Sequence, residues 1–276
     1  MNETKIRGSK FFYRDLNPDS TNVILLVHGH PFDNSMWNYQ IEALSQYRLI
    51  VPDLRGYGKS DFDFDKIYIE EQALDLTILL DQLQIAKVHL VGLSMGGQII
   101  VEFARLFPHR TLSLVLCDSN PGNETTTTYG NRLQLAERIR QSGIMQYTDE
   151  DIHKYLHKDT ITQNRDVYNH LYQMMNSTTT QGAVASHRGR AERRDNRPFL
   201  SSIKQPALVV VGDQDFFTPI EEMKEIADRI PNAEFVVVPG AGHMPNMEQA
   251  SIFNDHVLAF YKRQRLIHEN PPEHAI

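Results

Sequence analysis

The chain has 276 residues, of which 41% are hydrophobic and 23% charged, a composition typical of a globular protein with a sizeable core. The 28 basic and 35 acidic side chains give a formal charge of −7, which argues against a nucleic-acid partner. No apolar run approaches the ~18 residues of a membrane span, and the N-terminus has no apolar segment of signal-peptide length. We therefore expect a cytoplasmic protein that does not engage a membrane.

Apolar runs in the first part of the chain predict the strands of a parallel sheet. The runs do not alternate with polar residues, which indicates strands covered on both faces. They lie at residues 23–27, 49–52, 88–91 and 112–116. Helices are predicted between them, at 70–83, where apolar residues recur at spacings of three and four, and at 98–107, which Pro108 ends.

The same alternation resumes near residue 206, after a segment of different character. Strand runs lie at 207–211 and 234–238, and helical patterns at 220–230 and 251–263. The intervening residues have no convincing strand run but contain helical segments at 132–141, 149–156 and 167–175. Ligands bind at the carboxyl ends of the strands in open α/β sheets, so a helical insertion there would form the substrate pocket. We predict an α/β core from residues 1–119 and 201–276, with residues 120–200 as a helical cap.

A Gly-x-Ser-x-Gly frame at residues 92–96 places Ser94 between a predicted strand and a predicted helix. This is the pattern of a nucleophile elbow. Gly92 and Gly96 allow a sharp turn that holds the serine backbone in a strained conformation and exposes its hydroxyl. Ser94 is therefore the candidate nucleophile, built to attack a carbonyl carbon.

A serine hydroxyl needs an imidazole to take its proton and a carboxylate to orient that imidazole. His243 lies in a glycine-rich loop directly after the strand run at 234–238, and Asp213 and Asp215 follow the run at 207–211. The order serine, aspartate, histidine is the one that the elbow architecture uses. We assign Asp215 as the acid and interpret Asp213 as a turn residue that accepts hydrogen bonds from local backbone donors, which leaves Asp213 as the alternative.

The oxyanion of the tetrahedral intermediate needs two hydrogen-bond donors. One is expected to be the amide of Met95, the residue after the nucleophile, and the other the amide of His30, with Phe32 as the alternative. The alternate histidines His28 and His30 could also share a metal, but no further ligands accompany them at metal-binding spacing. We expect no metal, and interpret His28 as a residue that hydrogen-bonds its own loop.

Three other features have structural interpretations. Cys117, the only cysteine, ends a strand run and is expected to be a buried, inert thiol. Residues 53–60 lack the glycine spacing of a phosphate-binding loop, so Asp53 and Arg55 are expected to tie neighbouring loops together. The basic cluster at residues 187–194 is interpreted as a solvated helix face or helix end rather than a polyanion site.

Five motifs resemble those of the α/β-hydrolase superfamily and occur in its order. They are His-Gly-His-Pro at 28–31, Asp-Leu-Arg-Gly-Tyr-Gly-Lys-Ser at 53–60, Gly-Leu-Ser-Met-Gly at 92–96, Gly-Asp-Gln-Asp-Phe-Phe-Thr-Pro at 212–219 and Gly-Ala-Gly-His at 240–243. The resemblance implies an α/β-hydrolase fold: a mostly parallel eight-stranded sheet flanked by helices, with a helical cap inserted after the sixth strand. It also implies a Ser94-His243-Asp215 triad and no cofactor.

Residues 186–195 and 242–249 are similar to the branch of 3-oxoadipate enol-lactonase-like esterases and lactonases. That similarity implies small esters or lactones as substrates. Serine at position 94 argues against haloalkane dehalogenases and epoxide hydrolases, whose relatives have aspartate there. His30-Pro31 departs from the Gly-Gly-Pro-Gly loop of carbon-carbon bond hydrolases, which disfavours that activity without excluding it.

We predict a serine hydrolase that cleaves a small carboxylic ester or lactone through an acyl-enzyme intermediate. Carbon-carbon bond hydrolysis and cofactor-free perhydrolase or haloperoxidase activity are alternatives that use the same triad. A ligand-binding or signalling protein on the hydrolase scaffold is the alternative of another class. The expected partner is the small-molecule substrate, and the sequence leaves homo-oligomerisation open.

Overall fold

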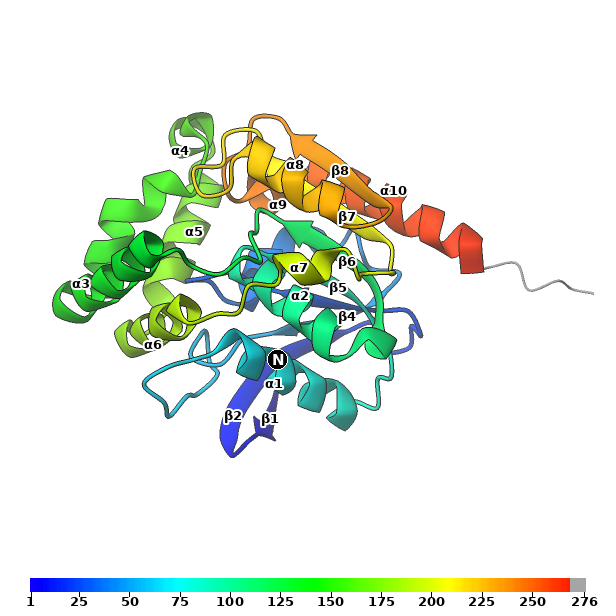
Figure 1. The fold of residues 1–276 in the computed structure, drawn as a ribbon, viewed down its shortest axis with the longest axis horizontal. Coiled ribbons are helices and arrows are strands. Elements are labelled where there is room, and N and C mark those ends of the chain that lie inside the picture. Colours follow the sequence, from blue (N-terminus) through cyan, green and yellow to red (C-terminus); the bar gives the residue numbers. More distant parts are fainter. Residues whose placement is uncertain (269–276) are drawn as a thin grey trace, which may run out of the picture.

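The computed structural model describes residues 1–268, and its centre is one eight-stranded sheet (Figure 1). The strands are β1 (Asn2–Ile6), β2 (Ser9–Leu16), β3 (Val23–Val27), β4 (Arg48–Pro52), β5 (Val88–Leu93), β6 (Thr111–Cys117), β7 (Ala207–Gly212) and β8 (Ala233–Val238). Their order across the sheet is β1-β2-β4-β3-β5-β6-β7-β8. β2 is antiparallel to both of its neighbours, and the other pairs are parallel. The mostly parallel eight-stranded sheet implied by the family resemblance is confirmed.

The six apolar runs identified in the sequence all become strands, with ends that differ by at most two residues. β3 illustrates why such runs lack alternation. All five of its residues are buried. Ile24 and Leu26 belong to one hydrophobic cluster, whereas Leu25 and Val27 belong to the other, so both faces of the strand lie in the core.

The hairpin of β1 and β2 was not among the strand runs read from the sequence. In β2, buried Phe11 and Tyr13 alternate with exposed or half-buried neighbours, as expected of a strand with one covered face. The connecting residues Arg7 and Gly8 have φ values of 48° and 88°, the positive angles that a tight hairpin turn requires. A strand with this alternation contains no continuous apolar run, so it was not identified from the sequence.

Helices cover both faces of the sheet (Figure 1). On one face, α1 (Ile69–Gln82), α2 (Met95–Leu106) and α8 (Ile220–Arg229) share a hydrophobic cluster with the sheet. On the other face, η1 (Asn34–Gln40), α9 (Pro245–Glu248) and α10 (Ala250–His268) belong to the second cluster. A short turn, η2 (Pro108–Arg110), leads from α2 into β6. No helix within the described residues combines the length and the apolar character needed to cross a membrane.

The chain between β6 and β7 forms a helical insertion beside the sheet (Figure 1). Its elements are α3 (Thr126–Asp151), η3 (Ile152–Lys154), α4 (Lys158–Gln163), α5 (Arg165–Ser177), α6 (Thr180–Ala191) and α7 (Arg197–Leu200). α3 contains a kink at Gly143, whose φ is 85° and ψ 165°. The helix predicted at 149–156 is therefore the end of α3 followed by a short 3-10 turn.

The interpretation of residues 187–194 as a solvated helix face is wrong. They do contain a helix end, because α6 ends at Ala191, but His187 and Arg190 are buried. The cause is close backbone packing: a Cβ atom at Gly182 would collide with the carbonyl oxygen of Gly56, and one at Gly189 with that of Ile67. The helix therefore lies directly on the loop that precedes α1, and the side chains of His187 and Arg190 are buried, whereas Arg194 is exposed.

Candidate active site

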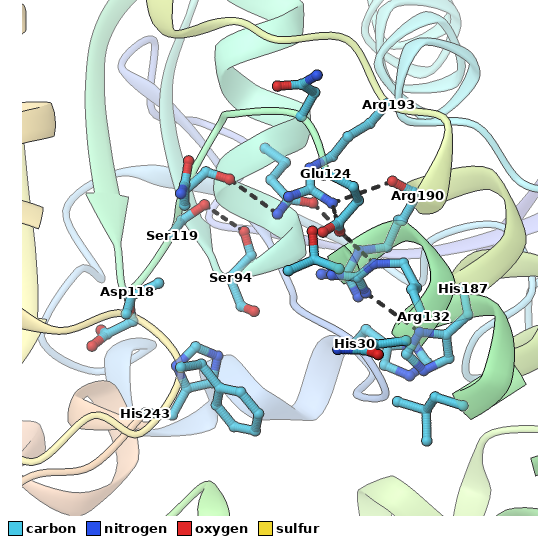
Figure 2. A pocket seen from close by; sticks show the side chains of 18 of the residues that line it. His30, Ser94, Asp118, Ser119, Glu124, Arg132, His187, Arg190, Arg193 and His243 are labelled. Atoms are coloured by element: carbon cyan, nitrogen blue, oxygen red, sulfur yellow. Dashed lines mark hydrogen bonds and ion pairs between the residues drawn. The ribbon is translucent and has the colours of Figure 1, made fainter. Parts of the chain in front are cut away.

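Ser94 lies at the junction of β5 and α2 with φ 56° and ψ −116°, a strained conformation for a residue with a side chain. Its amide donates to the carbonyl oxygen of Cys117 at 2.9 Å, and Ser119 Oγ donates to its carbonyl oxygen at 2.6 Å. These bonds tie the turn to the end of β6. They hold the backbone fixed while the side chain of Ser94 faces the cavity in Figure 2.

The two glycines of the elbow are required by close backbone approaches. A Cβ atom at Gly92 would collide with the carbonyl oxygen of Gly96, and a Cβ atom at Gly96 with that of Val27. The first turn of α2 therefore lies against the carboxyl end of β3. The loop after β3 is brought beside the nucleophile for the same reason.

His243 follows β8 and pairs with Asp215, which follows β7. The ring nitrogen Nδ1 lies 3.0 Å from Oδ1 and 2.9 Å from Oδ2 of the carboxylate. An ionised carboxylate only accepts hydrogen bonds, so Nδ1 carries the proton and Nε2 is left to exchange one. Burial alone would raise the pKa of Asp215, but His243 and donors from Thr218 and Phe217 lower it below its ordinary value. The acid is therefore ionised at neutral pH.

Of the two candidate acids, only Asp215 contacts the histidine. Asp213 Oδ1 accepts from the amides of Gly240 at 2.9 Å and Ala241 at 3.3 Å, in the loop that leads to His243. This is the local backbone role predicted for it. No hydrogen bond joins Ser94 Oγ to His243 within the described residues, as is common before substrate tightens such contacts.

The expected oxyanion donors lie on the two sides of the elbow. Met95 is the first residue of α2, where a main-chain N–H has no partner inside the helix. His30 lies in the loop after β3 and lines the same cavity as Ser94. The alternative donor, the Phe32 amide, donates instead to the carbonyl oxygen of Gly29 at 3.2 Å.

The structural interpretations of three other residues are confirmed. The two ring nitrogens of His28 contact the Gly29 carbonyl oxygen and the Leu54 amide, so its ring fixes the loops. Cys117 is buried, and burial raises the pKa of its thiol well above the ordinary value. Asp53 accepts from the Asn34 amide at 2.9 Å and the Lys59 amide at 3.0 Å, joining two loops.

A cavity of about 570 Å³ contains Ser94 and His243 and extends under the helical insertion. Sequence reasoning missed two kinds of residue here. The first is the group of arginines from the insertion that line the cavity, Arg132, Arg190, Arg193 and Arg197, of which the first three are labelled in Figure 2. The second is Asp118, directly after β6, which could have been found because it ends a parallel strand at the same edge as Ser94.

Asp118 lies against the acid-histidine pair. It offers a carboxylate oxygen within 4.8 Å of ligand atoms of Asp215 and His243. Its Oδ1 accepts from the Gly212 amide at 2.9 Å, and its Oδ2 is buried without a hydrogen-bond partner among the described residues. Burial and the nearby charge of Asp215 raise the pKa of Asp118 well above its ordinary value. Burial therefore favours the neutral form of Asp118, whereas Asp215, whose pKa is lowered, is the charged partner of His243.

Glu248 is a second residue that the sequence did not single out. Its Oε1 accepts from the amides of Gly242 at 2.8 Å and Met244 at 3.3 Å, the two neighbours of His243. Its Oε2 accepts from the His157 amide at 2.6 Å and Thr160 Oγ1 at 2.7 Å. One buried carboxylate thus joins the histidine loop to the start of α4.

Comparison with known proteins places the chain in a family. Residues 22–250 match the family model described as the alpha/beta hydrolase fold, and the chain belongs to that family. It is 35% identical to a thermophilic esterase from Thermogutta terrifontis solved with malate bound, with a TM-score of 0.90 over 95% of this chain and 97% of that one. It is 27% identical to the enol-lactonase from Burkholderia xenovorans LB400, with a TM-score of 0.88 over 95% and 100% of the two chains.

The name of a third relative describes a different reaction. The chain is 29% identical over 262 residues to a 2-hydroxy-6-oxononadienedioate/2-hydroxy-6-oxononatrienedioate hydrolase from Paraburkholderia phymatum, covering 86% of each chain. The protein is thus an enzyme of the α/β-hydrolase superfamily that resembles enol-lactonase-like esterases and also has carbon-carbon bond hydrolases among its relatives.

Proposed function

We propose that the protein is a serine hydrolase that cleaves small carboxylic esters or lactones. The observation that carries the proposal is one cavity lined by a serine on a strained elbow and by a histidine paired with an ionised aspartate. The likeness to an esterase and an enol-lactonase supports ester over carbon-carbon bond cleavage.

In the first half of the reaction, Ser94 Oγ bonds to the substrate carbonyl carbon as its proton passes to His243 Nε2. Asp215 stabilises the resulting imidazolium, and the amides of Met95 and His30 donate to the oxyanion. Collapse of the intermediate breaks the carbon-oxygen bond of the ester. The leaving alcohol oxygen takes the proton from His243, and the acyl group remains on Ser94.

In the second half, water gives a proton to His243 as its oxygen bonds to the acyl carbon. Collapse of this second intermediate breaks the bond to Ser94 Oγ, which takes the proton back. The products are a carboxylic acid and the free enzyme. With a lactone, the alcohol formed in the first half stays attached to the acyl chain and leaves in the same molecule.

The helical insertion acts as the cap of this site in our proposal. Its Tyr155 ring lies 5.8 Å from the ring of His243, and the Tyr155 carbonyl oxygen accepts from the His243 amide at 2.9 Å. Residues 120–200 therefore shape the space around the reacting bond. The core of residues 1–119 and 201–276 supplies the triad.

The test is Ser94→Ala against short-chain nitrophenyl esters, together with labelling by a fluorophosphonate. We expect turnover and labelling to be lost in this variant and retained in Ser202→Ala, which replaces an exposed serine in a turn. Unchanged turnover in Ser94→Ala would exclude the mechanism. Turnover of a vinylogous 1,5-diketone in preference to every ester would favour the carbon-carbon bond hydrolase alternative.

A further inference from the structure

Asp118 is a buried acid beside the histidine of the site, and the mechanism proposed above gives it no role. It is 1% exposed and follows β6 with φ 43°, a left-handed conformation that few residues other than glycine, asparagine and aspartate adopt. Its amide donates to the Val210 carbonyl oxygen at 3.0 Å, which holds the backbone at this angle. Asp118 lies near His243 in Figure 2. Backbone strain of this kind is retained mainly at functional sites.

The two oxygens of the Asp118 carboxyl group have different surroundings. Oδ1 accepts from the Gly212 amide at 2.9 Å. Oδ2 is buried, and no N–H or O–H group among the described residues donates to it. A buried carboxylate oxygen without a donor is costly, because an ionised carboxylate can only accept hydrogen bonds. A proton on Oδ2 removes that cost where an acceptor lies within reach.

The acceptor within reach is Asp215. Asp118, Asp215 and His243 each offer a polar atom within 4.8 Å of the other two. Burial raises the pKa of Asp118 well above its ordinary value, and the charge of Asp215 and a hydrogen bond shared with it act in the same direction. Two carboxyl groups that share a site strongly disfavour double ionisation. The proton therefore belongs on the acid that lacks a donor, and the charge on the acid that has several.

The carboxylate of Asp215 has room for one more donor. An ionised carboxylate has about four lone-pair sites. His243 Nδ1 contacts both of its oxygens, at 3.0 and 2.9 Å, the Phe217 amide donates to Oδ1 at 2.8 Å, and Thr218 Oγ1 donates to Oδ2. Three groups therefore donate to Asp215, and a fourth completes its set.

We propose that Asp118 is a positioning residue whose protonated carboxyl group donates from Oδ2 to the Asp215 carboxylate. The inference rests on the proposed serine-hydrolase mechanism, in which Asp215 orients His243. The bond restrains the carboxylate in the orientation that contacts His243 Nδ1. It also keeps the charge opposite the imidazole at one unit, because the proton stays on Asp118 while His243 takes and returns its own.

The charge opposite His243 matters because the imidazole must be neutral to accept the proton of Ser94. A second negative charge at ~4–6 Å would stabilise the imidazolium and hold the histidine protonated in the free enzyme. The other titratable groups that act on Asp118 are Glu248 on α9, whose charge also favours the neutral form of Asp118, and Cys117 on β6, a thiol whose pKa burial raises. Neither supplies a positive charge that would hold Asp118 ionised.

Carboxyl-carbon NMR measures the protonation of Asp118 without catalysis. In protein labelled with ¹³C at the aspartate carboxyl carbons, we expect one signal at pH 7 with the chemical shift of a protonated acid. This signal should be absent from Asp118→Asn and present in Asp228→Asn, a control that replaces an aspartate on α8 whose side chain is 63% exposed. In Asp215→Asn the same signal should titrate at lower pH, because the charge that favours the proton is gone. An Asp118 that is ionised at pH 7, or whose titration ignores Asp215→Asn, would refute the proposal.

Ester kinetics test what the hydrogen bond does. Asp118→Ala removes the donor, and we expect kcat to fall about tenfold, the weight of one hydrogen bond to a charged group, with little change in KM. Asp118→Asn should restore most of kcat, because its amide nitrogen donates to Asp215 and asparagine tolerates the positive φ. A purely structural role for Asp118 would not predict this recovery together with an unchanged KM.

The pH profile of kcat/KM separates a neutral Asp118 from an ionised one. We expect the acidic limbs of wild type and Asp118→Asn to coincide, whereas the loss of a real charge at ~4–6 Å would move the limb of the variant to lower pH by about one unit or more. Wild-type kcat in Asp118→Ala, no recovery in Asp118→Asn, or a displaced limb in Asp118→Asn would each overturn the proposal and leave the hydrolase function standing. If the wild type hydrolyses no ester, the hydrolase proposal fails, and the NMR titration alone decides whether Asp118 donates to Asp215.

Discussion

Glu248 holds the histidine loop against the helical insertion, and its removal should loosen both. In Glu248→Ala, the amides of Gly242, Met244 and His157 lose their acceptor together with the Thr160 hydroxyl. Each buried backbone donor left unpaired costs about 1–3 kcal/mol. The hydroxyl can rotate to another partner, so three donors carry most of the loss.

One effect opposes this loss. Burial raises the pKa of Glu248, so the ionised carboxylate is itself disfavoured in the folded protein, and removing it returns part of the cost. We expect a net loss of about 3 kcal/mol in the free energy of unfolding, which lowers Tm by about 6 °C or more for a chain of this size. Glu248→Gln keeps one oxygen. It can still accept from Gly242 and Met244, and we expect about half the loss.

The assay combines thermal unfolding with steady-state kinetics on one ester. The control is Glu225→Ala, which removes a carboxylate on α8 whose side chain is 65% exposed. Because Glu248 accepts from both neighbours of His243, we expect kcat to fall about tenfold in Glu248→Ala with a smaller change in KM, and little change of kcat in Glu248→Gln. A Glu248→Ala protein as stable and as active as Glu225→Ala would refute the reasoning.

Two further substitutions test the charges around the cavity. Asp215→Asn should lower kcat by a factor of about 10⁴, because it removes the charge that orients His243. Asp213→Asn should mainly lower stability. If ester kinetics instead show the larger loss of kcat in Asp213→Asn, Asp213 is the acid. Burial alone would raise the pKa of Glu124, but Arg132 and Arg193 lower it to about 2 from an ordinary 4.5. That fall corresponds to about 3 kcal/mol, present above pH ~4.5 and lost as the pH falls toward 2. Urea unfolding should therefore show wild type and Glu124→Gln converging over this range, and a gap independent of pH would contradict the assignment.

The six parallel strands of the sheet could be predicted from the sequence because both of their faces are covered. Such strands become continuous apolar runs, as in β3, where neighbouring residues enter opposite halves of the core. The β1-β2 hairpin has one covered face and therefore alternates, so only the family resemblance implied the additional strands. Whether a strand is covered on one face or on both therefore decides whether its sequence is a continuous apolar run.

The elements of the proposed triad were readable for a related reason. Ser94, Asp215 and His243 each follow a buried strand, and parallel strands bring their carboxyl ends to one edge. The sequence analysis assigned Asp215 and kept Asp213 as the alternative, because spacing does not say which of two side chains in one turn reaches the histidine. In the structure Asp215 contacts His243, whereas Asp213 accepts from the backbone.

The basic residues of α6 were misjudged because local composition does not say which face of a helix is buried. Charged residues are usually exposed, so a cluster of them predicts a solvated face. A signal was present in the glycines: Gly182 and Gly189 are seven residues apart and so lie on one face of the helix. Two glycines in that register indicate a face that packs against backbone, which is what they do against Gly56 and Ile67.

Gln98 joins the two chemical halves of the cavity. Its Nε2 donates to the Asn120 carbonyl oxygen at 3.1 Å, while its Oε1 accepts from Arg190 Nε at 3.3 Å. The amide is thus fixed in one orientation on the helix that begins after Ser94. In our proposal the reacting side chains of Ser94, His243 and Asp215 are carried by the sheet and its loops, whereas the arginines of the cavity are carried by the helical insertion. Substitutions of those arginines should therefore change which substrate is accepted and leave proton transfer unaltered. A fold that separates reaction from selection in this way can evolve new substrates on an unchanged triad.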